Sequence, residues 1–350
     1  MASHTPSGCH SPMRSKGRTM TLVINAAAIV VLLWSFPIPA QAATTCFGRV
    51  ATLVGTEVHD EITGTPGDDV IVSMGGSDEI LGRGGNDLIC AGGGNDRVLS
   101  GPGNDRVQLG KGSDSADGEA GNDLIVGGSG RDFMRGGAGN DRLEGGGDRD
   151  SLVGGSGSDR ILGGGNSDFA SGGPGADTMS GGGGSDTLTG DEGDDHVMGG
   201  KGSDRIRGSE GNDVLEGGQA EDDIAFAVRG HGVRVDLAAG RASGEGSDRI
   251  SGIERVEGTA WSDVLLGDGA ENVLEGGRGD DRLDGRGGDD LLIGGSGNDD
   301  IVGGSGTDEV SFLGANSAVV NLASGTATGL GRIPFPRSRM SSVPSATTSW

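Results

Sequence analysis

The sequence predicts an all-β protein, a parallel β-roll in which short strands wind into a solenoid, and three observations support this prediction. Glycine contributes 76 of the 350 residues, while hydrophobic residues make up 32% and aromatic residues 3%, a composition that cannot fill a large globular core. Residues 64–225 divide into consecutive blocks of nine without an insertion. Acidic residues outnumber basic ones 52 to 27, and every block carries an aspartate at the same place. A disordered acidic chain would not keep this phase, so the period indicates a repeat protein.

Residues 1–42 have the features of a secretory signal peptide. Three basic residues at 14–18 precede an apolar run at 22–34 and an A-x-A cleavage site at 40–42, the order that such signals follow. The alternative is a retained membrane anchor, which is disfavoured because the apolar run has 13 residues and a span needs roughly 20. We therefore expect a secreted chain that begins at Ala43 and has no membrane span after cleavage.

Cleavage would leave Cys46 and Cys90 as the cysteines of the mature chain. An even number of cysteines in an oxidising compartment predicts a disulfide between them. The alternatives are two free thiols, or a lipid attached to Cys46, which is disfavoured because the preceding residues lack the leucine of a lipobox. No histidine lies at zinc-ligand spacing from either cysteine.

The first array consists of the eighteen blocks of residues 64–225. The sixth position of the block is always aspartate, the eighth is always apolar, and the fourth is glycine in fifteen blocks. The glycine-rich hexamer that ends in aspartate suits a turn with positive φ angles, and the tripeptide after it suits a short strand with one side chain pointing inward. Two blocks then make one coil, and nine coils stack through parallel strand pairing.

Stacked turns would place the aspartate carboxylates in rows along the two edges of the solenoid, about 4.8 Å apart. Like charges in a row repel one another unless a counter-ion lies between them. Carboxylates together with the carbonyl oxygens of a glycine-rich turn form an irregular all-oxygen site, which suits Ca²⁺ better than Mg²⁺ or softer metals. The sequence therefore predicts several bound calcium ions.

Residues 226–257 break the nine-residue period. Val233, Val235 and Leu237 alternate with polar residues, and Gly-Arg-Ala-Ser-Gly follows at 240–244. This pattern is typical of a hairpin, so we expect a β insert between two arrays.

A second array of six blocks occupies residues 258–311, and its sixth position is aspartate except at Asn272, which lacks the charge. Residues 312–331 resemble the insert again, as a partial second copy, and residues 332–350 are basic and rich in serine and proline, which predicts a disordered tail. The predicted calcium ligands are Asp69, Asp78, Asp87, Asp96, Asp105, Asp114, Asp123, Asp132, Asp141, Asp150, Asp159, Asp168, Asp177, Asp186, Asp195, Asp204, Asp213 and Asp222 in the first array, and Asp263, Asp281, Asp290, Asp299 and Asp308 in the second.

The blocks resemble the hemolysin-type nonapeptide GGxGxDxUx of RTX proteins, a family of calcium-binding parallel β-rolls. The resemblance covers most of residues 46–331. It implies that each ion lies between two turns of the same edge, so that the eighteen turns of the first array would offer at most 16 bridged gaps. The segment 43–63 is similar to the N-terminal cap of small secreted calcium-binding proteins of the actinobacterial type, which implies that the two cysteines staple a cap to the first coils.

Departures from the repeat predict weaker calcium binding at particular turns. One set replaces the fourth-position glycine, where a side chain opposes positive φ: Asp148, Asn166 and Ala220. The other replaces the first-position glycine in early blocks: Ser73, Ala91, Ser100 and Leu109.

Motifs for catalysis are missing from the sequence. The histidines that follow residue 42 are scattered, without an H-E-x-x-H zinc motif, and neither Lys111 nor Lys201 is followed by the Ser or Thr of a phosphate-binding loop. A net charge of −25 disfavours nucleic acid and anionic membranes as partners. We therefore expect a non-enzymatic, secreted protein that folds on binding calcium and acts as a structural or surface-interaction module, with a cell-surface or matrix component as partner. The alternative is the non-catalytic, calcium-binding part of a secreted protease or lipase whose catalytic domain is absent from this chain.

Overall fold

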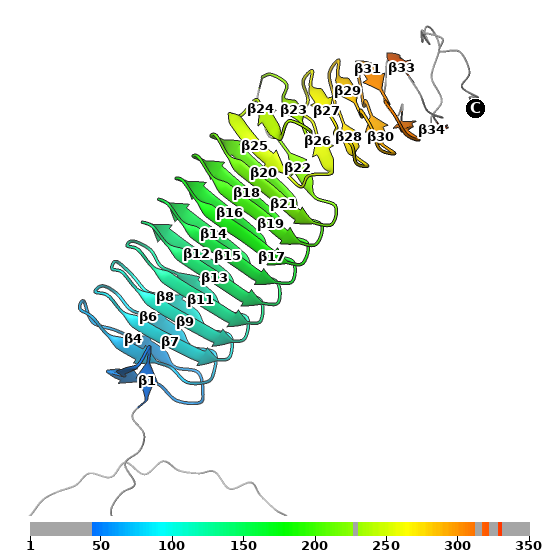
Figure 1. The fold of residues 1–350 in the computed structure, drawn as a ribbon. Coiled ribbons are helices and arrows are strands. Elements are labelled where there is room, and N and C mark those ends of the chain that lie inside the picture. The colour runs from blue at the N-terminus through cyan, green and yellow to red at the C-terminus, as the bar shows by residue number, and fades with distance from the viewer. Residues whose placement is uncertain (1–43, 227–229, 312–316, 322–327, 331–350) are drawn as a thin grey trace, which may run out of the picture. The chain divides into compact units, whose positions relative to one another are not determined.

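The computed structural model describes residues 44–226, 230–311, 317–321 and 328–330. All regular elements in this part of the chain are β-strands, which confirms the predicted all-β class, and most of them stack in two long sheets (Figure 1). No helix in the described part is long and apolar enough to cross a membrane. The expected signal peptide (1–42) and tail (332–350) lie outside the described residues, as does most of the expected partial insert (312–331).

The first of the two sheets, called the even sheet here, is parallel throughout and has fifteen strands. In spatial order these are β4 (Glu61–Thr63), β6 (Glu79–Leu81), β8 (Arg97–Leu99), β10 (Ser115–Asp117), β12 (Phe133–Ala138), β14 (Ser151–Ser156), β16 (Phe169–Pro174), β18 (Thr187–Glu192), β20 (Arg205–Glu210), β22 (Asp223–Ala225), β26 (Arg255–Glu257), β28 (Val273–Glu275), β30 (Leu291–Ile293), β32 (Glu309–Ser311) and β34 (Thr328–Leu330).

The second sheet, called the odd sheet, lies opposite and is parallel except at the insert. In spatial order it contains β3 (Leu53–Val54), β5 (Val70–Val72), β7 (Leu88–Gly93), β9 (Arg106–Lys111), β11 (Leu124–Ser129), β13 (Arg142–Gly147), β15 (Arg160–Gly165), β17 (Thr178–Gly183), β19 (His196–Lys201), β21 (Val214–Gln219), β25 (Ser247–Ser251), β24 (Arg241–Ser243), β23 (Arg234–Asp236), β27 (Val264–Leu266), β29 (Arg282–Asp284), β31 (Asn298–Val302) and β33 (Ser317–Asn321).

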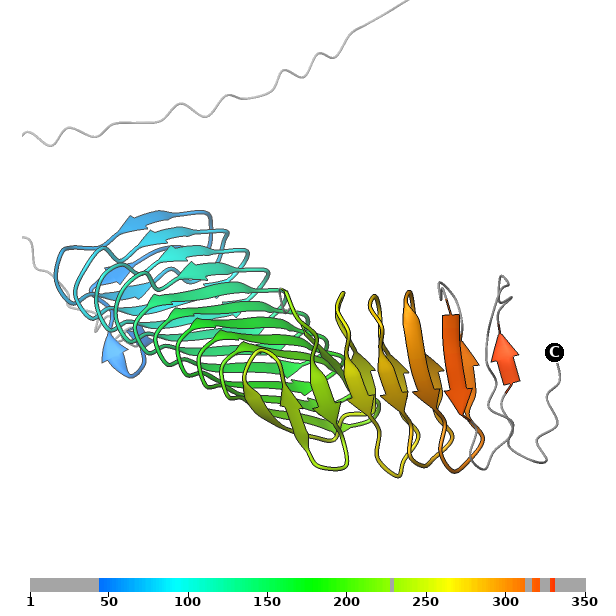
Figure 2. The ribbon, with the colours of Figure 1, turned by 90° about the horizontal axis from the view of Figure 1, so that it is seen from above.

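The strand register confirms the predicted coil of two blocks. Within the first array each strand aligns with the strand two blocks further on, as where Ile125 in β11 lies beside Leu143 in β13 and Leu143 beside Ile161 in β15. The chain alternates between the two sheets, so successive coils lie side by side (Figure 2). The eighth-position residues, from Ile71 to Val310, form one buried column between the sheets. One aliphatic side chain per block is enough for this core, which explains the low hydrophobic content.

Many strands of the first array are longer than the predicted tripeptide. Strands β11 to β21 span six residues each, from the seventh position of one block to the third position of the next. The added residues are largely glycines, and Gly128 aligns with Gly146 in the ladder between β11 and β13. Glycine therefore contributes to the strands as well as to the turns.

The N-terminal end is covered by a short ribbon in which β1 (Thr45–Cys46) pairs antiparallel with β2 (Arg49–Val50). A disulfide joins Cys46 to Cys90 in β7, as predicted. The Cys46 side chain is buried in a small cluster with Val70 and neighbouring apolar residues. The bond thus ties the ribbon to the odd sheet.

The stack begins one coil before the first nonapeptide counted from the sequence. Leu53 in β3 lies beside Ile71 in β5, and Ile62 in β4 lies beside Ile80 in β6, both in the same two-block register. The segment expected as a cap, residues 43–63, therefore also supplies the first coil.

The insert forms the predicted hairpin, in which Val235 in β23 lies beside Ala242 in antiparallel β24. Strand β24 also pairs antiparallel with β25. These three strands fill the place between β21 and β27 in the odd sheet. In the even sheet β22 pairs directly with β26, so the parallel stack continues on that side without interruption.

Candidate metal centre

The sixth-position aspartates form two buried rows, one along each edge of the stack. None of them is more than 7% exposed. In the first array one carboxylate oxygen, Oδ1, accepts the backbone N–H of the sixth-position residue one coil earlier at 2.7–2.9 Å, as Asp141 does from Asp123. The structure therefore brings the predicted ligands together in rows. It also buries them against the backbone, which their mutual repulsion alone does not predict.

Each row extends into the insert by one further residue, which the nine-residue period does not predict. Asp213 donates its N–H to Asp248 Oδ1 at 3.2 Å, and Asp222 donates its N–H to Glu254 Oε2 at 3.0 Å. The sequence does mark Asp248, because residues 246–250 read GSDRI, the same five letters as residues 202–206 of the first array. Asp248 does not fall on the nine-residue period, so the period did not predict it.

The second carboxylate oxygen of most of these aspartates has no hydrogen-bond partner. Oδ2 is buried and unpartnered in twenty of them: Asp78, Asp87, Asp96, Asp105, Asp114, Asp123, Asp132, Asp141, Asp150, Asp159, Asp168, Asp177, Asp186, Asp195, Asp204, Asp213, Asp222, Asp281, Asp290 and Asp299. Leaving a buried acceptor without a partner costs about 1–3 kcal/mol, and more when it is charged. A protein that repeats this arrangement twenty times needs a proton or a cation at these oxygens.

Burial raises the pKa of most of these carboxyl groups above their ordinary value. Desolvation is the main cause, the backbone N–H bond opposes it, and neighbouring aspartates raise the pKa further. The pKa reaches about 7 for Asp123, Asp195 and Asp281, and about 6 for many others, including Asp132 and Asp141. Without a cation, carboxyl groups such as Asp123 therefore hold protons up to near-neutral pH.

First-position glycines allow Oδ2 and a carbonyl oxygen to converge. A Cβ atom placed on Gly127 would lie 2.5 Å from Asp132 Oδ2 and 2.6 Å from the carbonyl oxygen of Gly145, one coil further on. The same pair of contacts recurs at Gly154, with 2.4 Å to Asp159 Oδ2 and 2.6 Å to the Gly172 carbonyl oxygen. A side chain added here would require one of the two oxygens to shift. Early blocks accommodate such a side chain at Ser73, Ala91, Ser100 and Leu109, and the aspartates of those blocks still have a buried, unpartnered Oδ2.

The donor set suits a hard cation. Across the described residues, no three His, Cys, Asp or Glu side chains lie close enough together to hold a metal by themselves, so any ion must also take main-chain oxygens. Carboxylate and carbonyl oxygens in a flexible, irregular arrangement are typical of calcium sites, while zinc and copper prefer nitrogen and sulfur ligands. The orphaned oxygens and the glycine-lined space beside them therefore fit Ca²⁺.

Three of the predicted ligands differ from the rest. The Oδ2 atoms of Asp69 and Asp263 accept hydrogen bonds from Thr65 and Thr259, respectively. Asp308 ends its row as far as the structure describes it, and its Oδ1 accepts the N–H of Asp290 at 3.2 Å. These residues do not present a buried orphaned oxygen.

Fifth-position side chains form a second, exposed polar row on each edge. Asn104 donates its N–H to Asn86 Oδ1, and Asn122 donates to Asn104 Oδ1, both at 2.8 Å. This row runs in the opposite sense to the aspartate row, since each N–H bonds to the coil before it. This row was not predicted, although the sequence carries a signal for it, since fourteen of the eighteen blocks have Asn, Ser or Asp at this position.

The replacements of the fourth-position glycine adopt positive φ, as their turns require. Asp148 and Asn166 have φ of 73° and Ala220 has 87°, whereas the positive-φ glycines at this position in the first array lie between 107° (Gly202) and 153° (Gly211). The turns at the replaced positions are therefore distorted. Weaker calcium binding at these turns stays a prediction.

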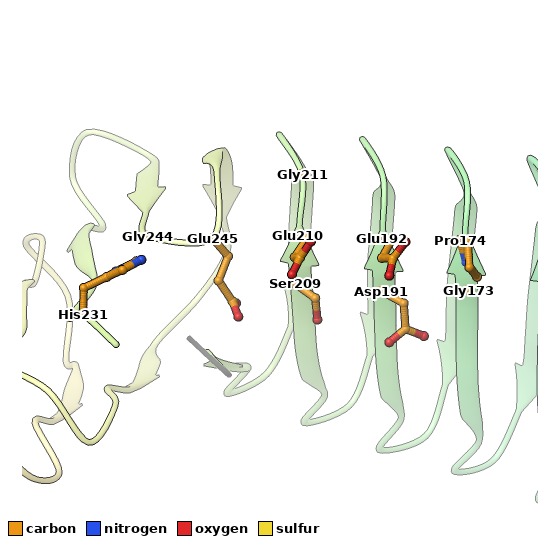
Figure 3. A pocket seen from close by; sticks show the side chains of 10 residues that line it. All are labelled: Gly173, Pro174, Asp191, Glu192, Ser209, Glu210, Gly211, His231, Gly244 and Glu245. Carbon is orange, nitrogen blue, oxygen red and sulfur yellow. The ribbon is translucent and has the colours of Figure 1, made fainter. Parts of the chain in front are cut away.

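A hollow beside the insert gathers acidic side chains on the surface (Figure 3). Glu192 and Glu210 come from successive strands of the even sheet and are exposed. His231 and Glu245 reach it from the insert. Solvent reaches Glu192 and Glu210, in contrast to the buried aspartate rows.

Comparisons with known proteins bear on the repeats. The family model described as RTX calcium-binding nonapeptide repeat (4 copies) matches residues 55–98, 99–134, 135–170, 162–197, 171–206, 198–226, 250–283 and 275–310, which together make up more than half of the chain. No curated protein matches the chain. Among solved structures, the chain is similar to a hyperactive, Ca2+-dependent, beta-helical antifreeze protein from an Antarctic bacterium, at 15% identity and a TM-score of 0.23, over 78% of this chain and 81% of that one. A TM-score this low does not establish a common fold.

Proposed function

The chain belongs to the family of RTX calcium-binding nonapeptide repeats, and from this premise we propose that it folds outside the cell around several calcium ions held by its buried aspartate rows. The observation that carries the proposal is the set of twenty buried, unpartnered Oδ2 atoms. Each belongs to a carboxylate whose other oxygen is already bonded to the backbone, so its position is defined before an ion arrives.

The proposed ligands are the sixth-position aspartates with an orphaned oxygen, together with carbonyl oxygens of the glycine-rich turns. Bound calcium supplies positive charge that favours the ionised carboxylate in a buried position. The chain itself fixes Oδ1 through a backbone N–H and presents Oδ2 next to a first-position glycine, as at Asp132 and Gly127. Because metal binding supplies folding free energy, the rows link calcium to the stability of the stack.

Two features support action outside the cell. A disulfide joins Cys46 to Cys90, and such bonds persist in oxidising compartments. The N-terminal segment 1–42 has the sequence of a secretory signal. Extracellular calcium would then fill the rows after export, and we propose that the folded β-roll acts as a structural or surface-interaction module without catalytic activity.

Circular dichroism during a calcium titration tests this proposal. The chain without residues 1–42 is titrated with CaCl₂ at pH 7.5, with MgCl₂ as control and a chelator added at the end. We expect a cooperative gain of β signal with calcium, little with magnesium, and its reversal by the chelator. A chain that is fully β-rich in chelator at this pH, or unfolded at millimolar calcium, would contradict the proposal.

A further inference from the structure

Four turns close on their own sixth-position side chain and differ in this from the other described turns of the arrays. In three of them Thr56, Thr65 and Thr259, at the second position of the block, donate their backbone N–H to Oδ2 of Asp60, Asp69 and Asp263, each at 2.6 Å. In the fourth the N–H of Asp268 donates to Asn272 Oδ1 at 2.9 Å. We call these four the closed turns.

Side chains reinforce the closed turns. The threonine hydroxyls also donate to Oδ2, at 2.8 Å from Thr56 and 3.0 Å from Thr65. The second-position side chain in turn accepts the N–H of the fourth residue, as in Thr259 from Trp261 at 3.1 Å and in Asp268 from Ala270 at 2.8 Å. The oxygen that a cation would use is thus already bonded within its own turn.

The backbone at the second position separates the two kinds of turn. Every described block whose aspartate has an orphaned Oδ2 has a second-position residue with positive φ, whether glycine or not, such as Gly277 at 98° or Arg286 at 66°. Thr56, Thr65, Thr259 and Asp268 are not among the described residues with positive φ. We call the turns with positive φ at this position open turns.

The closed turns lie at the start of each run of repeats. Those at Asp60 and Asp69 lie one on each edge, the first in residues 55–63 directly before the first array and the second in its first block, and those at Asp263 and Asn272 lie in the first two blocks of the second array. In the last of these the sixth-position residue carries no charge. Closed turns thus occur at the start of both runs of repeats, although threonine and aspartate form three of them and aspartate and asparagine the fourth. This recurrence indicates a common role.

We infer that each run of repeats begins with two successive turns that take no calcium, and that the second position of the block decides whether a turn takes an ion. This inference rests on the proposed function and refines it, since it removes Asp69 and Asp263 from the predicted ligands. In a closed turn the sixth-position side chain is already hydrogen-bonded within the turn. The first calcium-bound coil can therefore stack on a neighbour that needs no ion of its own.

Calcium counting on the full chain tests the inference with matched variants. Asp263→Asn changes a closed turn, and Asp281→Asn changes the open turn that follows it on the same edge. Bound calcium is measured by atomic emission after equilibrium dialysis, and circular dichroism confirms that each variant is folded. We expect Asp263→Asn to bind as many ions as the wild type and Asp281→Asn to bind at least one fewer. Asp69→Asn and Asp87→Asn form the same pair in the first array, should a variant of the second array fail to fold.

The possible outcomes distinguish a failure of this inference from a failure of the proposed calcium binding. Equal losses from the closed and the open variant would overturn the inference and leave calcium binding intact, whereas a wild type that binds no calcium would overturn the proposed function as well. Thr259→Gly removes the side chain that closes the turn and permits positive φ, so we expect it to add an ion. An unchanged number of bound calcium ions would show that the second position does not decide whether a turn takes an ion.

Discussion

Each sixth-position aspartate has two tasks, one for each carboxylate oxygen. In Asp141, Oδ1 accepts the N–H of Asp123 at 2.8 Å and so joins two coils, while Oδ2 is buried without a partner. The residue is therefore part of the fold as well as of the candidate site. The invariance of aspartate among the repeats predicts a role for it, but the division of that role between the two oxygens appears only when the coils are stacked.

The structural role of a glycine depends on its position within the block. Gly181 and Gly183, at the first and third positions of one repeat, show the difference. A Cβ on Gly181 would lie 2.2 Å from Asp186 Oδ2, whereas a Cβ on Gly183 would meet nothing within 4 Å, and Gly183 does not have positive φ. We expect Gly181→Ala to lower the free energy of unfolding by about 2 kcal/mol or more, within the range for buried clashes. It should also lower the number of bound calcium ions.

The control, Gly183→Ala, should be neutral or stabilise the protein by up to about 1 kcal/mol, because alanine restricts the unfolded chain. Urea denaturation in saturating calcium measures both effects. Equal destabilisation by the two substitutions would contradict the assignment of the first position to the metal centre.

At the level of elements, the insert changes the phase of the sequence, and each row extends one residue into it. Strand β25 stacks on β21 and β26 on β22, with Asp248 and Glu254 continuing the rows. The turn before β26 is shorter than a nonapeptide turn, so a search for a fixed period of nine does not find Glu254. Alternating apolar residues were enough to predict the hairpin, because that pattern is local, whereas the pairing of β23 with β27 joins segments that no local pattern relates.

The contact of Arg286 with Asp236 holds the insert to the second array. The guanidinium donates from both NH groups to the two carboxylate oxygens at 2.8 and 2.9 Å, and to the Gly267 carbonyl oxygen at 2.9 Å. It also lowers the pKa of Asp236. We expect Arg286→Ala to reduce the free energy of unfolding by about 1–2 kcal/mol, since two-point charged hydrogen bonds are the stronger kind.

Arg282 provides the control, because its ion pair with Asp300 is single and both side chains are about half exposed, at 51% and 50%. Arg282→Ala should cost less than about 0.5 kcal/mol. Denaturation of the calcium-loaded chain measures both variants, and similar losses would show that the Arg286 contact does not hold the insert.

For the whole molecule, the rows make stability depend on pH in opposite directions with and without calcium. Many of the buried aspartates have a raised pKa in the folded chain, which reaches about 6 for Asp132 and about 7 for Asp123, against an ordinary value of 3.8. Between these values the folded chain holds protons that the unfolded chain has released, so its stability falls as pH rises. The metal-free chain should be most stable below about pH 4 and lose this contribution by about pH 7.

Calcium should reverse this dependence, because the ion needs the ionised carboxylate and protons compete with it. Urea denaturation followed by circular dichroism, on dialysed, calcium-free chain at pH 4.5 and pH 7.5 and again in saturating calcium, measures the effect, and a calcium-free chain already unfolded at pH 7.5 counts as the least stable sample. We expect lower stability at pH 7.5 than at pH 4.5 without calcium, and the opposite order with it. A metal-free chain that becomes more stable at pH 7.5 would refute the assignment of raised pKa values to the rows.

The sequence by itself determined the repeat, the coil of two blocks, the inward column of aliphatic residues, the hairpin and the oxygen-rich character of the site. These follow from periodicity and from the chemistry of single residues, which act within one block. The burial of the carboxylates, their backbone bonds to the previous coil, and the difference between open and closed turns were decided by the tertiary structure. They arise because residues two blocks apart become neighbours, and because the φ angle at the second position, which the sequence does not specify for residues such as Arg286 and Thr259, differs between turns with an unpartnered and with a hydrogen-bonded Oδ2.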